Sequence, residues 1–180
     1  MIFETDRTIV RLWRDVEADR LYDILRRDEV VQWFGGDMKP FEHVDEAAER
    51  IANWRKSHEE DPRYGSWAVE LKGSGTVVGT VLLKPLPNGE GGEVEIGWYL
   101  HPDSWGQGLA QESARGGLAK GFADGLSEIW AITHTTNEPS KKVALAIGMA
   151  DEGVFRDRWY DGPSQVFHIS REEWAVASQA

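Results

Sequence analysis

The most informative segment of this chain reads Glu93-Val94-Glu95-Ile96-Gly97-Trp98-Tyr99-Leu100, then His101-Pro102-Asp103-Ser104, then Trp105-Gly106-Gln107-Gly108-Leu109-Ala110. β-Branched and aromatic residues in its first part predict a strand, and the Pro-Asp-Ser run predicts a break after it. From Ala110 onward, small and apolar residues recur at helical spacing through Leu118. We therefore predict a strand, a tight turn and a helix.

The two glycines of the turn indicate a phosphate site. A helix that begins directly after them leaves backbone N–H groups unpaired at the positive end of its dipole. A P-loop would need a lysine after Gly108, where the chain has Leu109. A dinucleotide-binding turn would need a third glycine at Gln111 and an acid at the end of the next strand. Glu128 has that spacing but precedes the next apolar run. The third possibility is a loop that binds the diphosphate of an acyl-CoA.

The whole string resembles the core motif of the GNAT family of N-acetyltransferases. The matching residues are Glu95-Ile96-Gly97-Trp98, Trp105-Gly106-Gln107-Gly108-Leu109-Ala110, Glu112 and Ala114. The branch it most resembles is that of the ribosomal-protein-alanine N-acetyltransferases, the RimJ/RimL type. The resemblance implies acetyl-CoA as cosubstrate, no metal, and an amine acceptor.

Composition sets broad limits on function. The 180 residues are predicted to form one N-acetyltransferase domain, residues 1–180, with 41% apolar residues. The chain has no cysteine, which excludes disulfides, thiolate metal sites and a cysteine nucleophile. A net charge of −11 argues against binding to a nucleic-acid backbone. We find no apolar run long enough for a membrane span and no signal-peptide pattern, so we expect a cytoplasmic protein. We also expect it to be a monomer or a homodimer.

The order of predicted elements matches the family's fold. We expect one strand, two helices, three strands, a helix, a strand, a helix and two strands. This predicts an α/β (α+β) fold with a single mixed, mostly antiparallel central sheet of six to seven strands and helices on both faces. The strands at residues 93–100 and 129–133 should be parallel, because a helix connects them. We interpret residues 171–180 as a polar tail. The resemblance implies that the parallel pair splays apart at the CoA site.

The resemblance also implies which residues hold the cofactor. The pantetheine arm would pair with the backbone of Trp98, Tyr99 and Leu100. The diphosphate would lie on the backbone N–H groups of Gly106, Gln107, Gly108, Leu109 and Ala110, and the matching Trp105 beside them is also predicted to bind the cofactor. Asn137 and Ser140 match the family's Asn-x-x-Ser, in which the asparagine bonds the pantetheine amide and also caps a helix. Trp105 departs from the family's usual Gln or Arg, so it lacks a side chain that could bind the diphosphate.

Glu95 is the first candidate for a general base, because direct attack on the thioester needs a neutral amine. An ordinary strand carboxylate is the alternative, and Glu93 and His134 are weaker candidates. In many family members a tyrosine seven residues after the asparagine acts as the general acid, but this chain has Ala144 there. Ser140, or solvent, would then protonate the thiolate.

The acceptor is less well defined by the sequence. Trp33 and Trp159 are expected near its entrance. The resemblance implies that the first two helices and the loop between them, residues 35–40, cover the acceptor as a lid. Acids surround this predicted lid, namely Asp28, Glu29, Asp37, Glu42 and Asp45. These charges favour a cationic amine, either a protein N-terminus or a small molecule such as an aminoglycoside or polyamine. A non-catalytic acyl-CoA-binding or sensor domain is the alternative from another class.

Overall fold

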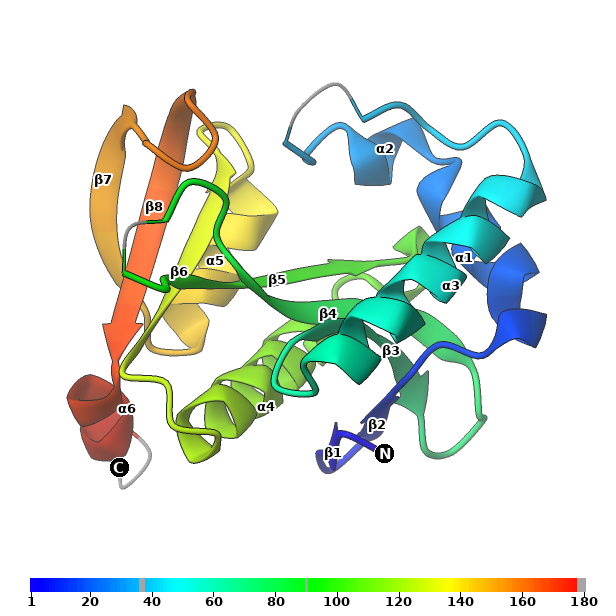
Figure 1. The fold of residues 1–180 in the computed structure, drawn as a ribbon, viewed down its shortest axis with the longest axis horizontal. Coiled ribbons are helices and arrows are strands. Elements are labelled where there is room, and N and C mark those ends of the chain that lie inside the picture. The colour runs from blue at the N-terminus through cyan, green and yellow to red at the C-terminus, as the bar shows by residue number, and fades with distance from the viewer. Residues whose placement is uncertain (36–37, 90, 178–180) are drawn as a thin grey trace.

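A computed structural model describes residues 1–35, 38–89 and 91–177. Its centre is one sheet in the order β1-β2-β3-β4-β5-β6-β8-β7 (Figure 1). All neighbouring strands are antiparallel except β5 and β6, which are parallel. The strands are β1 (Phe3–Glu4), β2 (Thr8–Arg11), β3 (Gly65–Leu71), β4 (Val77–Pro85), β5 (Val94–Leu100), β6 (Glu128–His134), β7 (Ala150–Arg156) and β8 (Pro163–Ser170).

Helices cover both faces of the sheet, as predicted. They are α1 (Ala18–Leu25), α2 (Asp28–Val31), α3 (Val44–Glu60), α4 (Leu109–Ala123), α5 (Glu138–Ala146) and α6 (Arg171–Ala177). On one face, α1, α2 and α3 enclose a cluster that includes Trp13, Leu21 and Ile51. On the other face, α4 and α5 pack on the larger cluster. No helix in the described part of the chain is long and apolar enough to cross a membrane.

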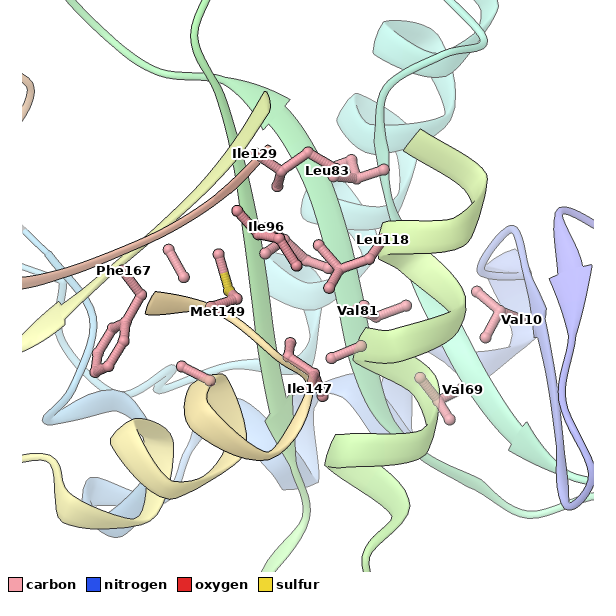
Figure 2. Packing of buried hydrophobic residues seen from close by; sticks show 14 of the residues in the cluster. Val10, Val69, Val81, Leu83, Ile96, Leu118, Ile129, Ile147, Met149 and Phe167 are labelled. Atoms are coloured by element: carbon pink, nitrogen blue, oxygen red, sulfur yellow. The ribbon is translucent and has the colours of Figure 1, made fainter. Parts of the chain in front are cut away.

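Three glycines let α4 lie close to the sheet. Figure 2 shows Leu118 of α4 packed among Val81, Leu83 and Ile96 of β4 and β5. A β-carbon at Gly117 would lie 3.0 Å from Ile96 Cδ1, and one at Gly121 would lie 2.8 Å from Ile129 Cδ1. A β-carbon at Gly116 would lie 2.5 Å from the Phe3 ring. The glycines therefore serve close packing, which outweighs their roughly 1 kcal/mol helix penalty each.

The sheet opens between its two parallel strands. Strand β4 pairs with β5 through seven residues, from Gly79↔Leu100 to Pro85↔Val94. Between β5 and β6 the only described pair is Glu95↔Trp130. Beyond Glu95 the two strands diverge, so the second half of β5 has no strand beside it on that side (Figure 1). The predicted splay is confirmed.

Two sequence predictions need correction. The sheet has eight strands instead of six to seven, because Phe3 and Glu4 pair with Val10 and Ile9 to form the short β1. The predicted polar tail is wrong, since residues 171–177 form α6. The Ser170 hydroxyl accepts from the Glu173 amide, and the Glu173 carboxylate accepts from the Ser170 amide. This capping box starts the helix, and Trp174 then stacks on Phe122 with centroids 5.8 Å apart.

Candidate active site

The glycine turn leads directly into α4. Gly106 and Gly108 have φ values of +72° and +74°, a region in which residues with a β-carbon are strained. The amides of residues 106–111 donate to no group in the described part of the chain. These unpaired donors stand at the positive end of a fifteen-residue helix. The geometry fits a diphosphate, whose oxygens accept hydrogen bonds and carry negative charge.

A salt-bridged arginine supports this turn from the N-terminal hairpin. Arg7 Nη1 donates to the Gln107 carbonyl at 2.9 Å, and Arg7 Nε donates to Glu112 at 2.6 Å. Glu112 also accepts from the Arg7 amide and the Thr5 hydroxyl. Burial raises the pKa of Glu112, but the Thr5 and Arg7 donors outweigh it and keep the pKa below its ordinary value. Sequence analysis noted Glu112 only as part of the motif and missed Arg7, which is 105 residues away.

Trp105 cannot replace the missing cation of the family motif. Its indole Nε1 donates to the Leu100 carbonyl at 2.9 Å, so the only polar atom of the side chain is occupied. About half of the residue is exposed, at 48%. The Trp105 backbone amide donates to the Pro102 carbonyl at 3.2 Å, so neither N–H group of Trp105 is left for a diphosphate.

The hydrogen-bond pattern of β5 shows which backbone groups face the splay. Leu86 N donates to Glu93 O, and His101 N donates to Val78 O. In an antiparallel ladder the bonded residues alternate, so Trp98 and Leu100 direct their backbone groups away from β4 and toward the open side. Tyr99 directs its backbone toward β4, opposite Thr80. The prediction that Trp98 and Leu100 pair with pantetheine is compatible with this pattern, although the Leu100 carbonyl already accepts from Trp105.

Asn137 caps α5, as predicted. Its Oδ1 accepts from the Ser140 amide at 3.2 Å, and its Nδ2 donates to the Thr133 hydroxyl at 3.1 Å. One hydrogen of the side-chain amide remains for a ligand. The Ser140 hydroxyl is half-buried and has no partner among the described residues. Their roles toward CoA stay predictions.

Glu95 lies at the point where β5 and β6 separate. It is 8% exposed, and its Oε2 accepts from the Tyr160 hydroxyl at 2.6 Å. Lys84, its cross-strand partner on β4, lies 3.4 Å from the same oxygen. Burial raises the pKa of Glu95, and the opposing effects of Lys84 and Tyr160 do not cancel this rise. A carboxylate with a raised pKa is a stronger base than an ordinary surface carboxylate.

Glu93 and Glu95 both contact the turn between β7 and β8, through Arg158 and Tyr160 respectively, but the environment of Glu93 is different. Its Oε2 accepts from the Gly91 amide at 2.9 Å, and its Oε1 accepts from Arg158. The Gly91 amide, with Arg158, lowers the pKa of Glu93 below its ordinary value. Both oxygens are occupied, which favours a structural role for this carboxylate.

Two contacts join the chain after α2 to the other half of the sheet. The rings of Trp33 and His134 have centroids 6.0 Å apart, and a β-carbon at Gly35 would lie 3.7 Å from Tyr160 Cδ1. Trp159 is 5% exposed and packs on Trp130, so it is a core residue. The neighbouring Tyr160, which sequence analysis missed, is the aromatic residue that contacts Glu95.

The predicted acidic groups of the lid are exposed where the structure describes them. These are Asp28, Glu29, Glu42 and Asp45, whereas Asp37 lies outside the described residues. Arg27 approaches Glu29 at 3.8 Å. Within the described ranges, no group of three or more His, Cys, Asp and Glu side chains is arranged to hold a metal ion.

A splayed parallel pair with a glycine turn at its helix is the arrangement of acyl-CoA N-acyltransferases. Residues 7–150 match the family model described as "Acetyltransferase (GNAT) domain", and the chain belongs to this family. An uncharacterized N-acetyltransferase of Bacillus subtilis, YoaA, is 31% identical over 160 residues, covering 88% of each chain.

Solved structures show the same fold. RimJ of Mycobacterium smegmatis, in complex with CoA-disulfide, matches with a TM-score of 0.77 and 22% identity over 96% of this chain and 89% of that one. AAC(6')-Ib, in complex with ribostamycin and coenzyme A, matches with a TM-score of 0.76 and 19% identity over 94% of this chain and 97% of that one.

Proposed function

We propose that this protein transfers the acetyl group of acetyl-CoA directly to a primary amine, either a protein N-terminus or a small cationic amine. The observation that carries the proposal is the position of Glu95. This buried carboxylate lies at the single described pairing point of the parallel strands, beside the open half of β5. The unpaired amides of residues 106–111 lie beyond the other end of that strand. A cosubstrate that spans the two features would bring its thioester close to a base.

In the proposed reaction the neutral amine attacks the thioester carbonyl carbon. The carbon–nitrogen bond forms, the carbon–sulfur bond breaks, and the electron pair leaves with sulfur. Glu95 accepts the proton that the nitrogen loses, directly or through water. Ser140, whose hydroxyl has no partner among the described residues, gives a proton to the thiolate, and solvent then restores it. The chain has no cysteine, so no thiol acyl-enzyme forms.

A protein N-terminus and a small cationic amine both fit this chemistry. The neighbours of the same fold include RimJ and a structure that holds ribostamycin. Their identity to this chain is too low to transfer either acceptor. The exposed acids Asp28, Glu42 and Asp45 support a cationic acceptor of either kind.

The test combines an acceptor screen with a matched pair of variants. Acetyl-CoA is offered with N-terminal peptides, polyamines and aminoglycosides, and both thiol release and acetylated product are measured. With the best acceptor, Glu95→Gln should lower kcat by about 100- to 10,000-fold, the usual contribution of a general base. Glu93→Gln is the control from the same strand and should lower kcat less. Wild-type turnover in Glu95→Gln would refute the base assignment, and CoA binding without transfer to any amine would favour the sensor domain.

A further inference from the structure

We propose that Tyr160 is a positioning residue for the transferase reaction. Its hydroxyl holds one oxygen of Glu95 and leaves the other oxygen to accept the proton of the amine. This inference rests on the proposed role of Glu95 as the base. It assigns a part in the reaction to the turn between β7 and β8, which no sequence motif marks.

The two oxygens of Glu95 are not equivalent. Oε2 receives the Tyr160 hydroxyl at 2.6 Å and has the Lys84 ammonium at 3.4 Å. Oε1 has no partner in the described part of the chain. It is also not one of the fully buried side-chain atoms without a partner, so it is not completely enclosed. It therefore keeps access to its surroundings. Two donors on one oxygen fix the rotation of the carboxylate, so Oε1 occupies a defined place.

The turn that carries Tyr160 is held in three ways. Asp157 Oδ1 accepts from the amides of Trp159 and Tyr160, and Asp157 N donates to the Gly162 carbonyl at 3.0 Å. The Trp159 ring is buried against Leu86, Val166, Trp130 and Ile132. From the loop after β4, Asn88 Nδ2 donates to the Trp159 carbonyl at 3.2 Å. Because the turn is anchored on both sides of the splay, the hydroxyl is preorganised toward Glu95.

The phenol remains protonated throughout the reaction. Burial and the adjacent Glu95 carboxylate raise the pKa of Tyr160 well above its ordinary value. It therefore acts as a hydrogen-bond donor to Glu95 and not as a second base. The titratable groups that face Glu95 are Lys84 from β4 and Tyr160 and Asp157 from the turn. Lys84 and Tyr160 favour the charged carboxylate, whereas Asp157 opposes it.

Tyr160 also contacts the segment after α2, which belongs to the predicted lid. The chain at Gly35, after α2, lies against the edge of its ring. Lys84 Nζ lies 5.6 Å from the centre of the same ring. Replacing the tyrosine by phenylalanine keeps these ring contacts and removes only the hydroxyl, which makes Tyr160→Phe the informative variant.

The test is the titration of Glu95 by carbon-13 NMR in protein labelled at glutamate side chains. The Glu95 resonance is identified by its loss in Glu95→Gln. In Tyr160→Phe its midpoint should move to higher pH by about one unit, because a hydrogen bond that stabilised the charged form is gone. Lys84→Met should move it in the same direction, and Tyr22→Phe, whose hydroxyl donates to the Glu42 carbonyl, should leave it unchanged.

Kinetics give a second measurement with the best acceptor of the screen. Tyr160→Phe should lower kcat about tenfold, shift the acidic limb of kcat/KM to higher pH and leave the KM for acetyl-CoA unchanged. An unshifted NMR midpoint with an inactive Glu95→Gln would overturn only the role of Tyr160. Wild-type turnover in Glu95→Gln would remove the base assignment and this inference with it.

Discussion

Replacing Gly108 by valine should weaken CoA binding at a modest cost to the fold. At φ +74° a residue with a β-carbon costs about 1–2 kcal/mol, and a β-branched residue is at the upper end. Steric conflict within the protein adds little, since an added β-carbon would meet only Arg7 Nη2, at 3.6 Å. We therefore expect a loss of roughly 3–6 °C in Tm for a chain of this length.

The cost for binding arises when the turn relaxes and its amides move. Losing a hydrogen bond to a charged phosphate costs about 1.5–3 kcal/mol, which corresponds to about a 10- to 150-fold rise in the Kd for CoA. Isothermal titration calorimetry with CoA measures this rise directly.

Gly75, in the turn between β3 and β4, provides a matched control. It has φ +72°, and an added β-carbon there would meet no atom within 4 Å. Gly75→Val should therefore lose similar stability and keep the wild-type Kd for CoA. An unchanged Kd in Gly108→Val, or an equal rise in both variants, would refute the assignment of the diphosphate to this turn.

Three further predictions concern the chemistry, the acceptor and the pH dependence of stability. Ser140→Ala should lower kcat and leave the KM for acetyl-CoA unchanged, so a change confined to that KM would make Ser140 only a ligand contact. With the best acceptor, kcat/KM should fall between low salt and roughly 0.5 M salt, and a flat profile or a preference for an anionic acceptor would remove the charge argument. Glu112 has a lowered pKa in the folded state, so its contribution is present above its ordinary value of 4.5 and is lost as the pH falls through the lowered value. Urea unfolding should show Glu112→Gln less stable by roughly 1 kcal/mol at pH 7, a figure reduced for solvent screening because Arg7 is half exposed, with the gap closing in acid; a gap that does not depend on pH would contradict this role.

Features whose physical cause is local could be predicted from the sequence. Gly106 and Gly108 produce the turn because only glycine adopts positive φ without strain, and the helix spacing that follows identifies α4. Asn137 caps α5 through an amide three residues away. The same kind of local pattern, Ser170 with Glu173, begins α6, although the polar composition of residues 171–180 suggests a tail.

The residues that surround these features come from distant parts of the chain and are identified by the folded structure. Tyr160 reaches Glu95 across 65 residues, and Arg7 reaches Glu112 across 105. Sequence analysis chose Trp159 from the turn between β7 and β8, but packing buries that ring on Trp130 and leaves Tyr160 for the site. The path of the turn decides which of these two neighbouring aromatic residues packs in the core and which reaches Glu95. This path is set by Asp157 and Asn88. Such hydrogen bonds depend on how strands far apart in the chain are brought together, which no short-range periodicity records.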